Sequence, residues 1–263
     1  LTIASYNLED FSNNRSETSD DKARRLARAF ANDMQNPDII GVTEVQDNNG
    51  RQPGDSRADE SYERLIQAIV DAGGVEYEYA NIDPLNNQDG GAPDANIRVG
   101  FLYNPDRVQM TEGMPEGDAT TAVGYEEGKL THNPGRIDPT NEAFASSRKP
   151  LAAQFDFQGE NVVVLVNHWN SKSGDTPLFD STQPPVYGSE VQRLQIANIV
   201  NDFVEEIKAD NPDANIVSVG DFNHFEFTEA LQVHEGEHMT NMIHEVEEAD
   251  RYTYLFQGNS QVL

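Results

Sequence analysis

Asp221 and Asn223 stand two positions apart after a strand-like segment, residues 215–219, that is typical of a buried strand. Residues i and i+2 of a strand point to the same side of its sheet. A carboxylate and an amide placed in this way could address one substrate atom together. The alternative is a turn, because Asp and Asn commonly form the turn that follows a strand.

Three further strand-like segments end in polar side chains suited to catalysis: Asn7, Glu44 and His168. Glu44 follows a wholly apolar strand, where a carboxylate is rarely without a partner. Asn7 alone is also typical of a turn, and a lone histidine such as His168 is often a hydrogen-bonded structural residue. Because ligands of open sheets gather beyond the ends of the strands, the joint occurrence of four such ends favours a site there.

Strands and helices alternate along the sequence, which predicts one α/β domain over residues 1–263. Apolar residues recur at helical spacing in three segments, which are 20–34, 61–72 and 190–207. Strands are expected at residues 1–6, 38–42, 76–81, 97–103, 151–157, 161–167 and 215–219. The fifth and sixth of these strands form a predicted hairpin. Long surface loops are expected at residues 110–147 and 171–188.

The formal net charge of −28 is extreme for 263 residues. It favours solubility at a cost in self-repulsion, and it also indicates a protein that works in concentrated salt, where repulsion is screened. Such a surface repels a polyanion, so a nucleic-acid substrate would require metal cations and a few local arginines. No apolar run is long enough to cross a membrane. The absence of cysteine excludes disulfides and thiolate metal sites.

Six segments resemble, in the same order, the motifs of the endonuclease/exonuclease/phosphatase (deoxyribonuclease I-like) family. They are SYNLEDF (5–11), IIGVTEVQ (39–46), IRVGFLYNP (97–105), SRKPL (147–151), VNHWNSK (166–172) and VGDFNHFEF (219–227). The fourth and fifth segments, together with a Gln-Pro-Pro loop at 183–185, are most similar to secreted bacterial and archaeal nucleases. No single motif is specific for the family, but six motifs in the family order over nearly the whole chain make a specific match.

The resemblance implies a four-layered α/β sandwich, in which helices flank two central mixed sheets, and hydrolysis of a phosphate ester by water with Mg²⁺ or Mn²⁺. On this basis Glu44 is a metal ligand and Asn7 lies beside it, since hard divalent cations prefer oxygen donors. Asp221 would position and deprotonate the attacking water, and Asn223 would hold a phosphate oxygen or the metal site. His168 would donate to the phosphate and stabilise its developing charge.

Three basic residues are candidates for phosphate contacts under the same resemblance: Arg98, Arg148 and Lys172. A guanidinium group matches the oxygens of a phosphate in geometry and charge. In so acidic a protein, either arginine could instead form a structural ion pair.

Two acidic loops, residues 13–21 and 173–180, suggest structural Ca²⁺ sites. Asp175 and Asp180 are the candidate ligands in the second loop. The alternative for each is a plain solvated loop.

The sequence departs from the family in two places. No acidic residue lies between Ile97 and Tyr103, where the family has a carboxylate that orients the active-site histidine. The family also ends with an Asp-His pair, usually in a Ser-Asp-His run, which would follow Gly258–Leu263. We therefore expect that the chain as given lacks its C-terminal strands and this catalytic pair, is poorly active and exposes an unpaired sheet edge.

A competing motif, HEGEH at residues 234–238, matches the zinc-protease pattern HExxH letter for letter and continues to His244. Its chemistry would be imidazoles on zinc, with Glu235 as the general base. Gly236 weakens the helix that this pattern requires, and no methionine follows Met242 to build the turn beneath the metal. Zinc proteolysis is therefore a remote alternative, behind incidental metal binding by the same histidines.

The sequence as a whole predicts a secreted, metal-dependent endonuclease that hydrolyses DNA, with RNA as a further substrate. Little sequence preference is expected if its contacts go to phosphates rather than to bases. A phosphatase or phospholipid phosphodiesterase on the same fold is the alternative, and a non-catalytic binding module is a third. We expect a monomer without membrane contact, whose signal peptide is not in the given chain.

Overall fold

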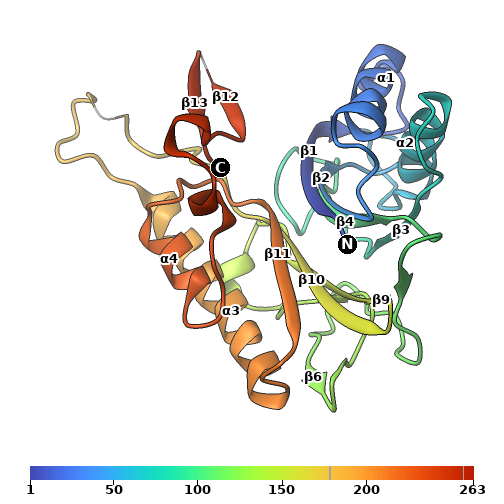
Figure 1. Ribbon diagram of the computed structural model, residues 1–263. Helices are drawn as coiled ribbons and strands as arrows, with labels where there is room; N and C mark the ends of the chain where they lie inside the picture. Colours follow the sequence, from blue (N-terminus) through green and yellow to red (C-terminus); the bar gives the residue numbers. More distant parts are fainter. Residues whose placement is uncertain (178, 257) are drawn as a thin grey trace.

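Two mixed β-sheets lie face to face at the centre of the molecule, and a pair of helices covers the outer face of each sheet (Figure 1). The structure, a computed structural model, describes residues 1–177, 179–256 and 258–263. From left to right in Figure 1 the layers are helices, a five-stranded sheet, a four-stranded sheet and helices. The expected four-layered α/β sandwich is thus confirmed.

The four-stranded sheet has the order β1-β2-β4-β3. Its strands are β1 (Ile3–Phe11), β2 (Ile39–Val45), β3 (Glu78–Asn81) and β4 (Arg98–Tyr103). β1 and β2 run parallel, whereas β4 is antiparallel to both β2 and β3. The outer face is covered by α1 (Asp20–Arg28), which a π-helical turn (Ala29–Asp33) extends, and by α2 (Asp59–Asp71).

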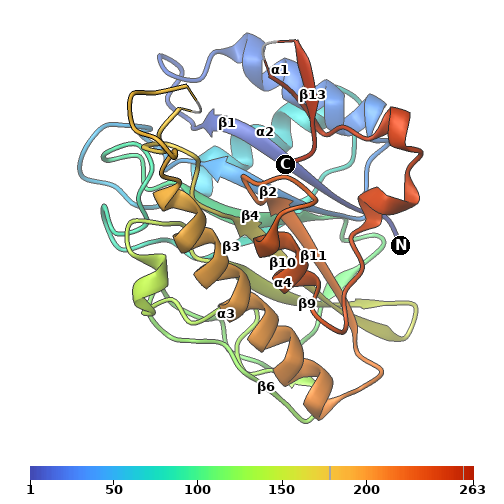
Figure 2. The same ribbon diagram turned by 90° about the vertical axis from the view of Figure 1, so that its left-hand side faces the viewer.

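The five-stranded sheet has the order β11-β10-β9-β5, with β8 also paired to β9. Its strands are β5 (Gln109–Met110), β8 (Gly135–Arg136), β9 (Leu151–Phe157), β10 (Glu160–His168) and β11 (Asn215–Asp221). β9 and β10 form the expected hairpin, and β10 and β11 run parallel. The outer face is covered by α3 (Gly188–Asp210) and α4 (Glu229–Glu235), which Figure 2 shows in front of β10 and β11.

The ends of the helices follow from local chemistry. Ser19 caps α1, because its side chain accepts a 3.1 Å hydrogen bond from the backbone amide of Lys22. Asp20 and Asp21 lie in the first turn and Arg28 lies in the last, each at the end where its charge complements the helix dipole. Each of the expected helices and strands is present, with ends shifted by a few residues.

Residues 110–147 differ from the expected surface loop. The segment contains the short strands β6 (Tyr125–Glu126) and β7 (Lys129–Leu130) and a 3₁₀ turn (Glu142–Phe144). Its apolar side chains, including Val123 and Ile137, are buried in the core beneath α3. Single anchor residues separated by irregular backbone produce no period of 2 or 3.6 residues, so the pattern did not reveal this burial.

The two sheets approach each other closely at Gly41 of β2. A methyl group at this position would lie 2.8 Å from Cγ2 of Val219 on β11 and 3.0 Å from Cγ2 of Val166 on β10. A side chain here would therefore push the sheets apart. Each of these strands reaches a candidate site residue two or three positions later, at Glu44, Asp221 and His168.

The C-terminal part of the described chain forms a hairpin of β12 (Tyr254–Phe256) and β13 (Asn259–Gln261), which stands away from the sandwich in Figure 1. Two 3₁₀ turns, Met242–Glu245 and Glu248–Asp250, precede it. In the sheet itself, β11 is the edge strand and pairs with β10 alone among the described residues. None of the helices in the described ranges is long and apolar enough to span a bilayer.

Candidate active site

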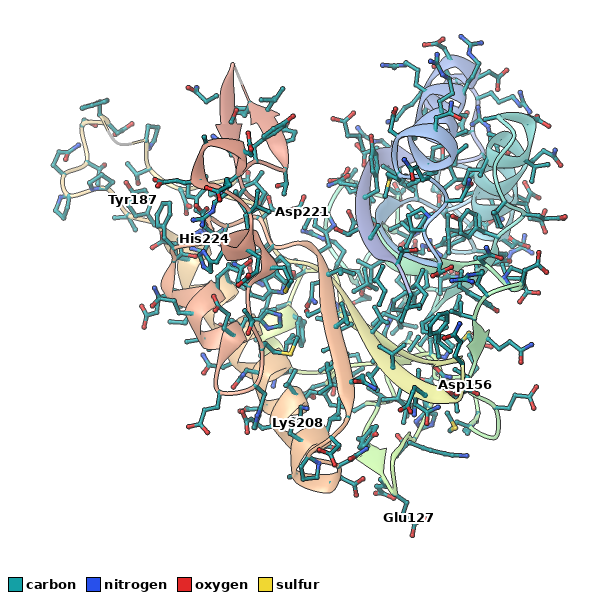
Figure 3. The ribbon with its side chains drawn as sticks, viewed as in Figure 1. Glu127, Asp156, Tyr187, Lys208, Asp221 and His224 are labelled. Atoms are coloured by element: carbon teal, nitrogen blue, oxygen red, sulfur yellow. The ribbon has the colours of Figure 1, made fainter. Side chains whose placement is uncertain are left out.

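Four strands from both sheets deliver polar side chains to one end of the sandwich. β1 carries Asn7 and β2 carries Glu44 in one sheet, while β10 ends at His168 and β11 ends at Asp221 in the other. Figure 3 shows Asp221 where the carboxyl end of β11 faces the first sheet. The parallel register pairs Asn7 with Thr43 on one side and His168 with Asp221 on the other. The four residues predicted from strand ends are thus brought together.

Asn7 joins the two candidate carboxylates. Its Nδ2 donates to Oε1 of Glu44 and to Oδ2 of Asp221, both at 3.0 Å. Its own Oδ1 accepts from the backbone amide of Glu9 at 2.8 Å, which fixes the orientation of the amide. Two carboxylates from different sheets therefore converge on one nitrogen atom, an arrangement that concentrates negative charge at the sheet interface.

The backbone around Glu44 is bent into unusual conformations. Glu44 has φ of 59°, and Glu9 and Asp10 have φ of 51° and 61° in an irregularity of β1 between Asn7 and Phe11. These left-handed conformations are unfavourable for residues other than glycine and cluster at functional sites. Here they direct the amide of Asp10 toward Oε2 of Glu44, which accepts a hydrogen bond of 3.0 Å.

Asp10, which was not predicted from the sequence, also lies at the site. Its Oδ1 accepts from Nε2 of Gln46 at 2.8 Å, and its Oδ2 accepts from Nη2 of Arg51 at 2.7 Å. These contacts fix the position of Asp10, and the backbone amide of Asp10 in turn donates to Glu44. Asp10 lies within the motif SYNLEDF, so its position beside Asn7 was the available signal.

The pKa of Glu44 is raised above its ordinary value, chiefly because burial removes water from the carboxylate. The hydrogen bonds from Asn7 and Asp10 lower the pKa, whereas the negative charges of Asp10 and Asp221 raise it further. A cation at this place would relieve both the desolvation and the repulsion.

His168 is only 6% exposed, and its Nε2 lies 3.7 Å from Oε1 of Glu44. The pKa of His168 is lowered well below its ordinary value, first by burial and then by the charge of Arg148. The ring is therefore neutral at neutral pH and can donate one hydrogen bond from Nε2. Its buried Nδ1 has no hydrogen-bond partner among the described residues, which agrees with the lack of an orienting carboxylate on β4.

Asn223 does not share a strand face with Asp221. β11 ends at Asp221, and Asn223 has a left-handed φ of 51°. Its backbone amide donates to Oδ1 of Asp221 at 2.9 Å, and its Nδ2 donates to the carbonyl of Trp169 at 3.0 Å. The expected i, i+2 geometry was wrong because the aspartate side chain captures the amide two residues on and turns the chain.

The three basic candidates lie in different surroundings. Arg148 is buried, donates to the carbonyl of Trp169 at 2.9 Å and feels the charges of Glu44 and Asp221, which offset the lowering of its pKa by burial. The ammonium group of Lys172 lies 4.4 Å from the ring centroid of Phe225. Both therefore belong to the strand-end region.

Arg98 corrects the expectation of a phosphate contact. It is 1% exposed, forms an ion pair with Asp83 and donates to the carbonyls of Asn96 and Ser56 at 3.1 and 2.7 Å. Nε and Nη1 are bound by these partners, and the whole side chain is buried away from ligands. The structural ion pair, which the sequence left open as the alternative, is the role that the structure shows.

The two calcium candidates have different partners. Asp175 receives hydrogen bonds from the backbone amide and hydroxyl of Ser189, at the start of α3, and lies 3.9 Å from Arg193. Asp180 accepts from its neighbour Thr182 at 3.1 Å. In residues 1–177, 179–256 and 258–263, no group of three or more His, Asp or Glu side chains is arranged to hold a metal ion. The calcium expectation thus gains no support.

The HExxH segment cannot form the zinc site of a protease. α4 ends at Glu235 and Gly236 has φ of 51°, so the two histidines do not follow each other on one helix. Nε2 of His234 is bound to the hydroxyl of Ser218 at 2.8 Å inside the core. His238 instead lies 3.2 Å from Oε2 of Glu205 on α3. The glycine that weakened the motif in the sequence is the residue that separates its ligands.

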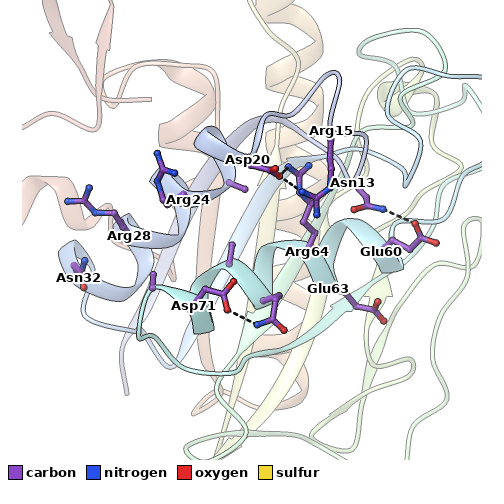
Figure 4. A pocket seen from close by; sticks show the side chains of 14 residues that line it. Asn13, Arg15, Asp20, Arg24, Arg28, Asn32, Glu60, Glu63, Arg64 and Asp71 are labelled. Carbon is purple, nitrogen blue, oxygen red and sulfur yellow. Dashed lines mark hydrogen bonds and ion pairs between the residues drawn. The ribbon is translucent and has the colours of Figure 1, made fainter.

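A groove on the helix pair α1 and α2 is a different feature. It lies between α1 and α2, has a volume of about 920 Å³ and is lined by charged side chains such as Arg24, Arg28 and Glu63 (Figure 4). None of the four strand-end residues lines it. We therefore place the candidate active site at the strand ends, where the convergent carboxylates lie, and not in this groove.

Comparisons with known proteins agree with this architecture. A sequence model described as the Endonuclease/Exonuclease/phosphatase family matches residues 127–262. A humanized D. rerio TDP2 has a TM-score of 0.50 at 17% identity, over 90% of this chain and 70% of that chain. A β-hairpin deletion mutant of Staphylococcus aureus beta toxin has a TM-score of 0.50 at 14% identity, over 89% and 71%. An endonuclease/exonuclease/phosphatase family protein from Bacteroides thetaiotaomicron has a TM-score of 0.51 at 14% identity, over 89% and 67%. No curated protein matches the chain.

Proposed function

Because this chain belongs to the endonuclease/exonuclease/phosphatase family, we propose that it is a metal-dependent endonuclease that hydrolyses the phosphodiester bonds of DNA. The observation that carries the proposal is the convergence of Asn7, Glu44, His168 and Asp221 from four strands of two sheets. These side chains combine oxygen ligands, a neutral imidazole donor and a carboxylate that can accept a proton. Each of these groups can contribute to the hydrolysis of a phosphate ester.

The donor set fits a hard divalent cation. Glu44 and Asp221 supply carboxylate oxygens within reach of one Asn7 amide, and the pKa of Glu44 is raised by desolvation and by like charges. Mg²⁺ typically binds one or two carboxylates and completes its shell with water and substrate phosphate. We propose that Glu44 holds Mg²⁺ or Mn²⁺ with Asn7 beside it. When bound, the cation would neutralise charge on the phosphate oxygens.

The remaining side chains act on the substrate. Asp221 is fixed by Asn7 and by the amide of Asn223, so one carboxylate edge can position an attacking water and take its proton. His168 is neutral and offers its Nε2–H to a phosphate oxygen. Arg148, with its Nε free of hydrogen bonds among the described residues, adds positive charge to the same region.

We extend the proposal to the conditions in which the protein works. The net charge of −28 would weaken the folded state by self-repulsion in dilute buffer, and salt would screen it. We propose a secreted, salt-adapted monomer with little sequence preference, acting on DNA and also on RNA. Contacts to phosphate rather than to base edges would provide that tolerance.

A plasmid-cleavage assay tests the proposed activity. Cleavage should require Mg²⁺ or Mn²⁺ and should be lost in Glu44→Ala and in Asp221→Ala, while Glu63→Ala, on the exposed side of α2, should cut as the wild type does. Normal cutting by both site variants would refute the nuclease. Hydrolysis of p-nitrophenyl phosphate or of phospholipid with intact plasmid would instead support a phosphatase or phospholipid phosphodiesterase.

A further inference from the structure

A pair of stacked aromatic rings follows directly after the candidate site. The rings of Phe225 and Phe227 lie 5.6 Å apart between centroids, with an interplanar angle of 17°. Phe227 is 68% exposed. Phe222 behaves differently, since its ring packs edge-on against the buried Trp169 at 4.9 Å. Phe227 is therefore the outward-facing member of the pair, and Phe225 beneath it is only partly exposed.

The backbone that carries this pair is fixed. The amide and the hydroxyl of Thr228 both donate to the carbonyl of Phe225, at 3.1 and 2.7 Å, immediately before α4 begins. On the other side, Asn223 is tied to Asp221 and to Trp169. The aromatic rings are thus presented on a braced turn that is continuous with the catalytic carboxylate. A ligand that contacts them would lose little entropy in ordering the protein.

A cation accompanies the rings. The ammonium group of Lys172 lies 4.4 Å from the ring centroid of Phe225 and is close enough for the charge of Asp221 to oppose the lowering of its pKa by burial. In Figure 3, His224 lies between the Asp221 end of β11 and the loop that carries Tyr187. Phe225 is thus contacted by both Phe227 and Lys172, and the exposed ring of Phe227, the positive charge and the candidate site lie along one short stretch of the chain surface.

From this juxtaposition we propose that Phe225, Phe227 and Lys172 form a subsite for an unpaired base and its phosphate next to the scissile bond. The preferred substrate is then single-stranded nucleic acid. This inference rests on the proposed function and specifies the form of its substrate. Aromatic side chains bind single strands by stacking on successive bases, with little dependence on sequence. In a duplex, the base faces are already stacked on one another and must be unstacked before they reach a ring.

The charge of the protein favours the same conclusion. Most nonspecific affinity for duplex DNA comes from neutralising its dense row of phosphates. A chain of net charge −28 has few basic side chains available to bind phosphates, since many of them are paired with carboxylates, as Arg51 is with Asp10. Stacking supplies affinity that does not depend on charge and that salt does not screen. An acidic nuclease in concentrated salt therefore gains most from an aromatic subsite.

The subsite can be tested by binding, independently of cleavage. Fluorescence anisotropy with EDTA present would compare a labelled short oligothymidylate with an oligomer of equal length whose sugars are abasic. We expect Phe227→Ala to weaken binding of the oligothymidylate about tenfold, within the range measured for one stacked base, and to leave the abasic oligomer unchanged. Phe227→Trp should retain the affinity. Val70→Ala, which removes another exposed apolar side chain on α2, should change neither.

Two results would overturn the subsite: unchanged oligothymidylate binding in Phe227→Ala, or an equal loss on both probes, which would indicate a change in shape rather than lost stacking. A competition between single-stranded and duplex DNA of one sequence adds a third criterion, since equal affinity would also refute it. The proposed catalysis is judged separately with Mg²⁺. Base-dependent binding without cleavage would reject the nuclease and keep the subsite, whereas cleavage without base dependence would do the reverse.

Discussion

His168 and His234 are both buried histidines whose pKa values are lowered by desolvation, and each has an Nδ1 without a hydrogen-bond partner among the described residues. Their surroundings differ. His168 lies 3.7 Å from Glu44 and feels the charge of Arg148, whereas His234 is bound to Ser218 and packs between Trp169 and Phe222. A perturbed pKa alone therefore does not mark a catalytic residue. Convergent charges from separate strands distinguish the candidate site from the core.

Substitution of Glu44, the carboxylate beside His168, should have the largest effect on the rate of hydrolysis. We expect Glu44→Gln to reduce metal-dependent phosphodiester hydrolysis about a thousandfold, because several kcal/mol of charge stabilisation by the cation would be lost. The substitution keeps the size of the side chain, so the unfolding temperature should change little. Initial rates on plasmid DNA over a Mg²⁺ titration measure the effect. A rate within a fewfold of the wild type would remove Glu44 from the site.

The two histidines should separate in a matched pair of variants. His168→Gln is expected to lower the rate about a hundredfold through the loss of a phosphate donor. His234→Gln should leave the rate intact and lower the unfolding temperature by several degrees, since it disturbs a buried hydrogen bond and aromatic packing. Steady-state rates and thermal melts of both proteins provide the comparison. The reverse pattern would show that His234, and not His168, takes part in the reaction.

A smaller effect is expected from the residues that brace the site. Gln46→Leu removes the hydrogen bond to Asp10, whose amide supports Glu44, and should weaken the apparent affinity for Mg²⁺ about tenfold. Gln67→Leu removes a similar side-chain contact, to Asp71 on α2, and is the matched control. Activity measured against Mg²⁺ concentration distinguishes them. Indistinguishable curves for Gln46→Leu and Gln67→Leu would mean that the hydrogen bond from Gln46 to Asp10 does not contribute to the Mg²⁺ affinity.

The smallest effect concerns pH and the core histidine. Burial lowers the pKa of His234 to about 4 from an ordinary value of 6.5. Between these values the unfolded chain binds a proton that the folded protein does not, so stability present above pH 6.5 is lost as the pH falls toward 4. The slope should approach about 1 kcal/mol per pH unit. Urea unfolding at several pH values should show a shallower slope for His234→Gln, and equal slopes would contradict the assignment.

The sequence predicted the larger elements because their signals are local. Helical spacing identified α1, α2 and α3, and apolar runs identified the strands, including the hairpin of β9 and β10. The buried segment 110–147 was not recognised, because its apolar residues anchor one by one. Order along the chain, rather than any one motif, pointed to the family that the sequence match over residues 127–262 confirms.

For the site, the sequence identified the candidate side chains Asn7, Glu44, His168 and Asp221, because each is a polar residue in or after a strand-like segment. His168 and Asp221 do end their strands, whereas β1 continues past Asn7 to Phe11 and β2 continues past Glu44 to Val45. The sequence could not determine which of them meet. The tertiary structure decided that through the close approach of the sheets at Gly41 and through the left-handed residues that turn the amide of Asp10 toward Glu44.

Residues far apart in the chain show the same division. Arg98 and Arg148 are the same residue type in the sequence. In the structure, Arg98 forms a buried ion pair with Asp83, whereas Arg148 interacts with the charges of Glu44 and Asp221. Likewise, the HExxH motif is complete in the sequence, but in the structure α4 ends at Glu235, just before Gly236 and between the two histidines. Residue type and local period are properties of the chain. The distance between charges and the partner of each buried polar atom depend on packing between distant segments, and only the folded molecule specifies them.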